Sequence, residues 1–138
     1  MIILDTNVVS ELLRPKPARQ VLGFLRGHGE ALGITTITIH EISFGLERLP
    51  EGGRKQGLAA AFLQFTESLM DSEILDLTEP AARRSGVLRA QRATAGRPIS
   101  MADAHIAGIA LETGHPLATR NTRDFQELGL RLIDPWQQ

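Results

Sequence analysis

The sequence opens with Ile2-Ile3-Leu4-Asp5, a short apolar run that is followed at once by a carboxylate. The same order recurs at three more acidic residues, because Glu41, Asp103 and Asp124 also follow apolar stretches. Short apolar runs of this kind are typical of buried strands in a parallel sheet. The carboxyl ends of parallel strands share one edge of the sheet, and α/β proteins bind ligands in the crevice outside that edge. We therefore expect the four acidic groups to converge on one spot.

Four converging carboxylates call for a cation. Clustered carboxylates repel each other, so one of them would have to take up a proton unless a cation held the group together. Ligands that are all oxygen select a hard cation, Mg²⁺ or Mn²⁺, and Mg²⁺ keeps several of its waters. One or two of the acids would then hold the ion directly, and the others would hold coordinated waters. Such a site can activate a water and neutralise the charge on a transferring phosphate, which predicts metal-assisted chemistry.

Helix capping is the competing explanation for the acidic positions. In a capping box, an acid three residues after a Ser or Thr bonds back to the backbone N–H of that cap. An acid there also favours the positive end of the helix. Asp5 is not explained in this way, because it directly ends the first strand. The two roles are compatible, since a capping carboxylate can still face a metal, and we favour metal binding for the set. The pairs that match the box or a close variant of it are Thr38 and Glu41, Ser100 and Asp103, and Asn121 and Asp124.

Strands alternate with helices along the whole chain. The apolar pattern predicts strands at residues 2–5, 32–36, 73–77, 116–119 and 130–133. It predicts helices at residues 7–13, 18–26, 39–49, 58–70, 79–95, 101–113 and 123–128, with Gly27-His28-Gly29 ending the second of them. The helix at 101–113 is rich in small residues, which would let it lie close against the sheet. The alternation indicates a single domain over residues 1–138, an α/β/α sandwich with a five-stranded, mainly parallel sheet.

Composition removes several functional classes. The chain has 138 residues, of which 42% are hydrophobic and 22% charged, as expected of a folded globular protein. Because there is no cysteine, a disulfide framework, a zinc–thiolate site and a cysteine nucleophile are all excluded. The sequence has neither a G-x-G-x-x-G nor a P-loop motif, so the dinucleotide-binding and P-loop classes fail. No run is long and apolar enough for a membrane span, and the N-terminus lacks the basic region of a secretory signal, so we expect a cytoplasmic protein.

The positive charge is unevenly distributed. The net charge of −1 gives no overall signature of nucleic-acid binding. The only lysines are Lys16 and Lys55, so the other basic residues are arginines, whose planar fork suits phosphate. Several arginines gather in residues 83–97, and two more flank the last acidic position. A solvated helix face and a phosphate-binding surface explain them equally well. The candidates for phosphate contacts are Arg89, Arg92, Arg120 and Arg123.

Several short motifs resemble one family when they are taken together and in order. They are Leu4-Asp5-Thr6-Asn7, Thr38-x-x-Glu41, Ala102-Asp103-x-x-Ile106-Ala107 and the run from Ala118 to Phe125. These motifs resemble the PIN-domain ribonucleases and, more narrowly, the VapC/FitB-type toxins of bacterial type II toxin–antitoxin systems. The terminal Asp134-Pro135-Trp136 resembles the end of FitB-like members, although packing of the chain terminus is the simpler role for Trp136 and nucleic-acid stacking the weaker one. The resemblance covers essentially the whole chain.

The resemblance implies a function and a set of partners. It implies a five-stranded parallel sheet and Mg²⁺-dependent endonucleolytic cleavage of RNA, with Mn²⁺ as a substitute. The substrate would be a structured RNA, tRNA or another RNA of translation, so that cleavage inhibits translation. The partners would be a VapB-like antitoxin that covers the acidic groove, a second copy of the chain in a homodimer, and DNA only indirectly through the antitoxin. Dimerisation would line up two arginine-bearing grooves and offset the modest basic surface.

The resemblance also assigns residues by position. Asp5, Glu41 and Asp103 would form the catalytic acidic triad, in which Asp5 and Asp103 hold the metal and Glu41 positions a water. Asp124 is the favoured fourth acid, and Asn121 is the alternative at that position as a secondary or water-holding ligand. The polar side chains expected to orient the carboxylates are Thr6, Asn7 and Thr119, with Asn121 as further support.

Three rival functions remain open on the sequence alone. A receiver-like phosphoryl-transfer domain would use strand-end acids and Mg²⁺, with Asp76 as the phosphoacceptor, but both lysines are badly placed for it. A haloacid-dehalogenase-like phosphatase would want two aspartates around the first strand, where this chain supplies only Asp5. The third rival is a catalytically inactive relative that only binds partners and whose acids are helix caps. In that case, metal would not change the stability of the protein.

Overall fold

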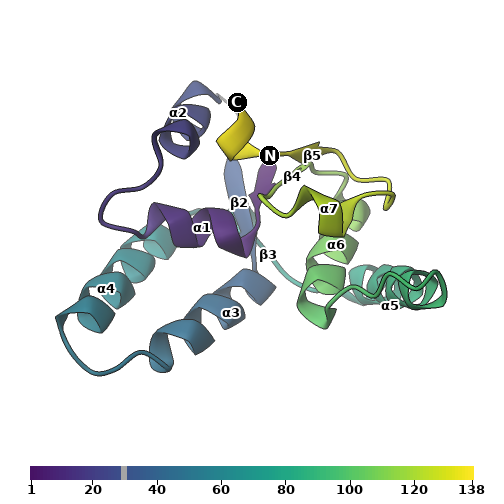
Figure 1. Ribbon diagram of the computed structural model, residues 1–138, viewed down its shortest axis with the longest axis horizontal. Helices are drawn as coiled ribbons and strands as arrows, with labels where there is room; N and C mark the ends of the chain where they lie inside the picture. The colour runs from purple at the N-terminus through teal and green to yellow at the C-terminus, as the bar shows by residue number, and fades with distance from the viewer. Residues whose placement is uncertain (29–30) are drawn as a thin grey trace.

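The structure is a computed structural model, and it describes residues 1–28 and 31–138. Short strands alternate with helices along this part of the chain (Figure 1). In chain order the elements are β1 (Ile2–Leu4), α1 (Thr6–Leu12), α2 (Arg19–Gly27), β2 (Leu32–Thr35), α3 (Thr36–Glu47), α4 (Gly53–Glu67), the 3₁₀ turn η1 (Asp71–Glu73), β3 (Ile74–Leu75), α5 (Glu79–Thr94), α6 (Met101–Thr113), β4 (Leu117–Ala118), α7 (Thr122–Phe125), β5 (Leu132–Ile133) and the 3₁₀ turn η2 (Pro135–Gln137). All five predicted strands are present, each inside its predicted range.

The strands form one sheet in the order β3-β2-β1-β4-β5, and every pair is parallel. The chain starts at the central strand β1 and moves outward through β2 to β3. It then returns to the other side of β1 with β4 and finishes at β5. The direction of progress therefore reverses between β1 and β4, where Leu4 is in register with Ala118. A reversal of this kind creates a crevice at the carboxyl ends of the two strands.

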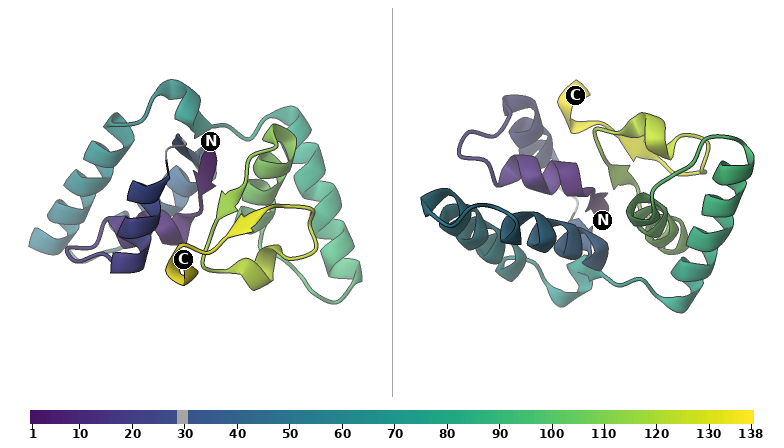
Figure 2. Two further views of the ribbon diagram at one scale, coloured as in Figure 1. Left: turned by 90° about the horizontal axis from the view of Figure 1, so that it is seen from above. Right: turned by 60° about the horizontal axis from the view of Figure 1, so that its bottom comes forward.

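Helices cover both faces of the sheet, as the two views of Figure 2 show. Because side chains alternate along a strand, Ile3 faces one apolar cluster while Ile2 and Leu4 face the other. The first cluster is completed by α5, α6 and α7, and the second by α1, α2, α3 and α4. This arrangement confirms the predicted α/β/α sandwich, and the sheet is parallel throughout. Within residues 1–28 and 31–138, no helix is both long and apolar enough to cross a membrane.

The ends of the helices follow their capping residues. Helix α6 has the predicted bounds, because Ser100 caps its start and Gly114 ends it in the left-handed conformation at φ 74°. Helix α3 starts three residues before the prediction, since the Oγ1 of Thr35 accepts a hydrogen bond from the N–H of Thr38. Helix α4 starts at Gly53 rather than at residue 58. Helix α2 ends at Gly27, and Gly29 of its predicted terminator lies outside the described residues.

The small residues of α6 make two contacts. Ala104 and Ala107 are buried in the apolar cluster that includes Ile3 of the sheet, as the prediction placed them. Gly108 faces α5 instead, where a Cβ added to it would lie 2.5 Å from the carbonyl oxygen of Ala81 and 3.0 Å from the Cβ of Ser85. The missing side chain is thus what allows α5 and α6 to pack closely. This pairing holds the N-terminus of α6, and with it Asp103, in place beside the crevice.

Candidate active site

An open cleft of about 1300 Å³ lies at the reversal point between β1 and β4. Asp5 follows β1 directly and Thr119 follows β4, and the Oγ1 of Thr119 donates a 2.7 Å hydrogen bond to the Oδ2 of Asp5. Asp5, Glu41 and Asp103 all contribute to the cleft wall. Three of the four predicted acids, which lie far apart in the sequence, are therefore brought to one place.

Asp5 is the most constrained of these acids. Its side chain is 3% exposed and accepts hydrogen bonds on both oxygens. The N–H of Thr6 donates to Oδ1 at 2.8 Å, and the Nδ2 of Asn7 donates to Oδ2 at 3.2 Å beside Thr119. Asp5 is itself the N-cap of α1, a role different from the capping-box pattern that was considered for the other acids. Burial raises the pKa of Asp5 above its ordinary value even though the hydrogen bonds from Thr119 and Thr6 lower it.

Glu41 is held by a chain of hydroxyl groups and does not act as a helix cap. It lies in the second turn of α3, because Thr35 and not Thr38 is the capping residue, so the predicted capping box is wrong here. The Oγ1 of Thr6 donates to the Oε1 of Glu41 at 2.6 Å and lies 3.0 Å from the Oγ1 of Thr38. A hydroxyl has a single proton, so Thr38 must be the donor in the second contact. Thr38 therefore orients Thr6, and Thr6 orients the carboxylate of Glu41.

The pKa of Asp103 is affected by the charges of the other three acids. Asp103 is in the first turn of α6, where its N–H donates to the Oγ of Ser100 at 3.1 Å, which is the serine half of the predicted capping box. Its pKa is raised from 3.8 to about 6. Burial is the largest cause, followed by the charge of Asp5, and the charges of Glu41 and Asp124 act in the same direction. A hydrogen bond with Ser100 only partly opposes them. The four acids therefore lie in one electrostatic field.

Asn121 and Asp124 take different places around the cleft. Asn121 lines it, and its N–H donates to the Oγ1 of Thr119 at 3.0 Å. As the N-cap of α7, Asn121 forms no side-chain capping bond, so the capping box predicted with Asp124 is absent. Asp124 is exposed on α7 and is not among the residues of the cleft wall, although its charge raises the pKa of both Asp5 and Asp103. Asn121 thus faces the cleft, while Asp124 acts on it through charge.

Asn7 ties the two halves of the site together. Its Nδ2 lies 3.4 Å from the Oγ1 of Thr119, and its Oδ1 accepts from the N–H of Arg120 at 3.3 Å. The segment that follows β1 is thereby fixed to the segment that follows β4. Thr119 is fully buried, so its hydroxyl has no solvent to exchange with. The three polar side chains predicted to orient the carboxylates, Thr6, Asn7 and Thr119, therefore all bond within the site.

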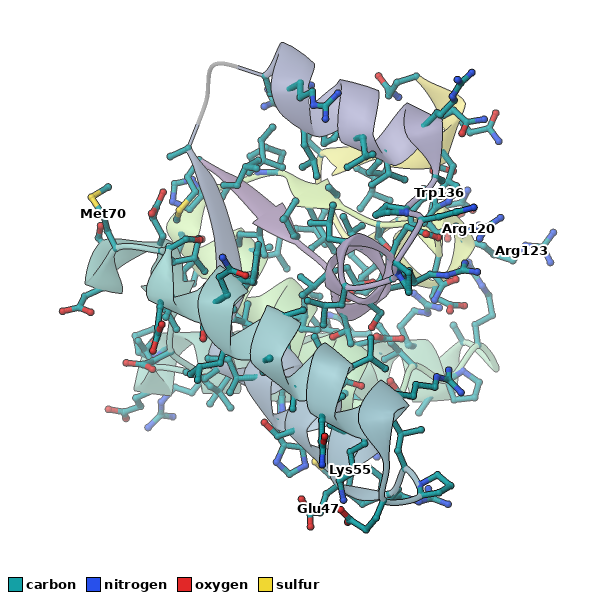
Figure 3. All side chains as sticks on the ribbon, turned by 90° about the vertical axis from the view of Figure 1, so that its left-hand side faces the viewer. Glu47, Lys55, Met70, Arg120, Arg123 and Trp136 are labelled. Atoms are coloured by element: carbon teal, nitrogen blue, oxygen red, sulfur yellow. The ribbon has the colours of Figure 1, made fainter. Side chains whose placement is uncertain are left out.

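The four candidate arginines have separate locations. Arg120 lines the cleft, with its guanidinium 4.8 Å from the centre of the Trp136 ring. Figure 3 shows Arg120 and Trp136 side by side and Arg123 reaching away from them. Arg89 is exposed on α5 and is not part of the cleft wall. Of the four, only Arg120 is therefore placed to meet a ligand in the cleft.

Arg92 was predicted to contact phosphate, and its position in the structure does not support that role. Only 9% of it is exposed. Its Nε donates to the carbonyl oxygen of Arg97 at 2.8 Å, and its Nη1 donates to that of Asp124 at 2.9 Å. The guanidinium thus joins the end of α5 to α7, and it supports the position of Asp124 instead of reaching a substrate.

Sequence reasoning missed three charged residues of the cleft. Arg14 and Arg54 line it from the segment after α1 and from the first turn of α4. Arg54 was overlooked because the start of α4 was predicted after it. Glu11 also lines the cleft and is buried, with its Oε1 3.3 Å from the Nη1 of Arg14 and its Oε2 accepting from the N–H of Ala18. The signal that could have identified it is the pair Glu11 and Arg14, an acid and a base three residues apart at the end of the first helix.

The donor set of the cleft fits a hard divalent cation. The carboxylates of Asp5, Glu41 and Asp103 line it together with hydroxyl and amide groups, and oxygen ligands of these kinds suit Mg²⁺ and Mn²⁺. After burial, the charges of the neighbouring acids contribute to the raised pKa of Asp103, and a divalent cation would offset that repulsion. In the described part of the chain, no group of three Asp, Glu, His or Cys side chains is arranged to hold a metal ion. The fit therefore rests on an ion that keeps several of its waters and takes only one or two protein ligands.

Comparisons with known proteins agree along the whole chain. The family model described as PIN domain matches residues 2–130. The chain is 36% identical over 138 residues to the VapC ribonuclease Y4jK of Sinorhizobium fredii, covering 99% of each protein. It is 31% identical to the tRNA(fMet)-specific endonuclease VapC of Shigella flexneri, covering 97% of this chain and 96% of that protein.

Two solved structures extend the similarity to the fold. The crystal structure of FitAcB from Neisseria gonorrhoeae has a TM-score of 0.89 at 34% identity and covers 100% of both chains. The DNA-bound VapBC from Salmonella typhimurium has a TM-score of 0.82 at 29% identity and covers 97% of both chains.

Proposed function

Since this chain belongs to the PIN-domain family, among the VapC-like toxins, we propose that its acidic cleft is the catalytic site of an Mg²⁺-dependent endoribonuclease. The family resemblance seen in the sequence motifs is confirmed, and the names of the relatives support a nuclease function. The proposal adds the metal, the residues that act and the outcome: cleavage of structured RNA, tRNA or another RNA of translation, and inhibition of translation. The tRNA(fMet) specificity of the relative from Shigella flexneri supports this choice of substrate.

The observation that carries the proposal is the convergence of Asp5, Glu41 and Asp103 on the wall of one cleft. Their closeness agrees with the raised pKa of Asp103, to which burial contributes most and the charges of the neighbouring acids add. A cluster that exists only to cap helices gains nothing from such mutual repulsion. A divalent cation would remove the repulsion and would allow all the acids to remain ionised at neutral pH.

In the proposed site, Asp5 and Asp103 would hold the cation directly. The cation would supply Lewis acidity, to activate a water and to neutralise charge on the scissile phosphate. Glu41, whose Oε1 accepts from the hydroxyl of Thr6, would use its other carboxylate oxygen to orient a water. Thr119 and Asn7 keep Asp5 from turning away. The exposed guanidinium of Arg120 is available to contact a phosphate of the RNA.

The proposal includes partners and a location. The VapBC and FitAcB structures support a VapB-like antitoxin as the partner, and the DNA in the Salmonella typhimurium structure supports indirect contact with DNA through it. An antitoxin would cover the cleft and could set a basic side chain among the carboxylates in place of the cation. We also propose that the toxin forms a homodimer and acts in the cytoplasm, where its RNA substrates are found.

The rival phosphoryl-transfer functions lose support from the geometry. Asp76, the phosphoacceptor of a receiver-like domain, is exposed after the edge strand β3 and does not line the cleft. A haloacid-dehalogenase-like site wants a second aspartate close to Asp5, and the neighbouring Asn7 instead donates a hydrogen bond to it. The remaining alternative is a catalytically inactive relative that only binds partners. Detectable cleavage of RNA would exclude this alternative, and its absence would favour it.

The deciding experiment is cleavage of total cellular RNA by the purified protein without antitoxin. Parallel reactions contain Mg²⁺, Mn²⁺ or EDTA. We expect discrete fragments with either metal and none with EDTA, and sequencing of the fragment ends would identify the target. Absence of cleavage, together with a melting temperature that metal does not change, would leave the inactive partner-binding relative as the better description.

A further inference from the structure

Trp136 and Arg120 form a stacked pair on the wall of the acidic cleft. The guanidinium carbon of Arg120 lies 4.8 Å from the centre of the indole ring, and both residues line the same cleft as Asp5, Glu41 and Asp103 (Figure 3). The pair comes from separate parts of the chain, the segment after β4 and the turn η2. Their meeting at the cleft is therefore a property of the fold that sequence spacing does not reveal.

The indole ring is firmly supported. The backbone N–H of Trp136 donates to the Oδ1 of Asp134 at 2.9 Å, which fixes the turn that carries the ring, and the preceding Pro135 is buried. The ring packs against the apolar cluster on the side of the sheet covered by α1 to α4. Trp136 nevertheless remains partly exposed, so it closes the terminus and also presents a surface to the cleft.

Arg120, in contrast, is loosely held at its charged end. Its backbone is anchored, because its N–H donates to the Oδ1 of Asn7, which also bonds Asp5. Its side chain is exposed, and in the described part of the chain its guanidinium forms no salt bridge, whereas those of Arg84 and Arg97 pair with glutamates. The ring of Trp136 is thus covered by a cation that can leave it without breaking an ion pair.

We propose that the Arg120–Trp136 pair is a nucleobase subsite, in which a base of the bound RNA stacks on Trp136 and takes the place of the guanidinium. This inference rests on the proposed function and adds a binding residue to it. An exposed cation–π contact is weak, whereas stacking of a base on an aromatic ring is stronger and accepts every base. The displaced Arg120 then exchanges the ring for a phosphate, with which its planar fork forms a charge-assisted hydrogen bond.

The position of the subsite sets a requirement on the RNA. Arg120 is the residue after Thr119, whose hydroxyl bonds Asp5, so the stacked base belongs to a nucleotide close to the scissile phosphate. A base can stack on a side chain only when it is free of its own helix. The nucleotide next to the cleaved bond is therefore unpaired, and its identity matters little to the stacking itself.

The composition of the chain supplies a direct test. Trp136 is the only tryptophan and there is no tyrosine, so the intrinsic emission of the protein reports this ring alone. The wild-type protein in EDTA is titrated with a short single-stranded RNA of mixed sequence, with the same strand annealed to its complement, and with inorganic pyrophosphate. Binding is followed in parallel by the anisotropy of a dye on the RNA. We expect saturable quenching of Trp136 by the single strand, and little change with the duplex or with pyrophosphate.

Substitutions separate stacking from charge. Trp136→Leu should weaken binding of the single strand about 10-fold or more, and Trp136→Phe should retain most of the affinity. Arg120→Ala should lower the affinity but preserve the quenching, because the ring is then already free. Arg131→Ala removes the same charge from an exposed position outside the cleft and should change neither the affinity nor the quenching. Melting temperatures report whether each variant folds. If Trp136→Leu does not fold, the quenching measured with the wild-type protein still tests the proposal.

The outcomes distinguish the subsite from the proposed function. If the wild-type protein cleaves RNA and binds the single strand, but its emission stays constant and Trp136→Leu binds equally well, the subsite is refuted and the nuclease stands. If the protein neither binds nor cleaves any RNA, the proposed function fails and the subsite falls with it.

Discussion

The carboxyl group of Asp103 connects the chemistry of the cleft to the stability of the protein. Its pKa rises from 3.8 to about 6 because of burial and then of the charges of Asp5, Glu41 and Asp124. Between these two values the folded, metal-free protein binds more protons at Asp103 than the unfolded chain does. This group therefore makes the folded state more stable as the pH falls from about 6 towards 4, and less stable as the pH rises.

Asp103→Asn removes the charge and keeps the shape, so it should stabilise the metal-free protein at neutral pH. Because Asp103 is only partly buried, we expect an increase of about 1–2 kcal/mol in the free energy of unfolding, less than the full shift implies. The increase should shrink as the pH is lowered below about 6. Urea denaturation in EDTA at several pH values measures it, and a variant that is less stable than wild type at neutral pH would disagree with the electrostatic account.

Single residues were predictable where the local sequence carries the signal. Asp5 and Asp103 follow apolar runs, and the cap at Ser100 is visible in the three residues before Asp103. The hydroxyl chain from Thr38 through Thr6 was not predictable, because it joins positions that meet only after the sheet has formed. The buried role of Arg92 was hidden for the same reason, since its partner at Asp124 is remote in sequence.

At the level of elements, the ends of a helix were predicted accurately only where the sequence carries a capping residue or a terminal glycine. Helix α6 was predicted to the residue, because its sequence contains both a serine cap and a terminal glycine. Helix α4 was misplaced at its start, where Gly52 provides no side-chain cap and the first turn is polar. The contact between α5 and α6 was also missed, since a glycine in a helix does not indicate which neighbour it admits.

Two glycine substitutions test that helix contact. Gly108→Ala should destabilise the protein by about 1–3 kcal/mol, because the new Cβ would meet the carbonyl oxygen of Ala81 at 2.5 Å. Gly86→Ala is the matched control, since Gly86 lies inside α5 with open space around it. It should instead stabilise the protein by about 0.5–1 kcal/mol, because alanine lowers the conformational entropy of the unfolded chain. Equal effects of the two substitutions in chemical denaturation would mean that α5 and α6 do not pack as described.

At the scale of the whole molecule, the alternation of strands and helices was enough to predict the class of fold. That alternation does not determine the order of the strands in the sheet. The position of the cleft depends on this order. The reversal between β1 and β4 brings Asp5 beside Thr119, and α6 then adds Asp103. Family resemblance supplied what local pattern could not, namely the role of each acid in the predicted site.

The expectation that residues 1–138 form a single domain stays a prediction. The two apolar clusters lie on opposite faces of the same strands, so the loss of the sheet would expose both. We expect thermal unfolding to be one cooperative transition, with the same midpoint by circular dichroism and by Trp136 emission. Two separate midpoints would show that the halves of the chain unfold independently.

The central claim is that the carboxylates of the cleft form a cation site, and calorimetric titration of Mg²⁺ and Mn²⁺ into the antitoxin-free protein tests it most directly. Near pH 6 Asp103 is about half protonated, so binding should release protons, which buffers of different ionisation enthalpy reveal. Asp103→Asn should abolish binding, whereas Asp76→Asn, at an exposed acid outside the cleft, should leave it intact. Binding that is absent in the wild-type protein, or that survives equally in Asp103→Asn, would contradict the account.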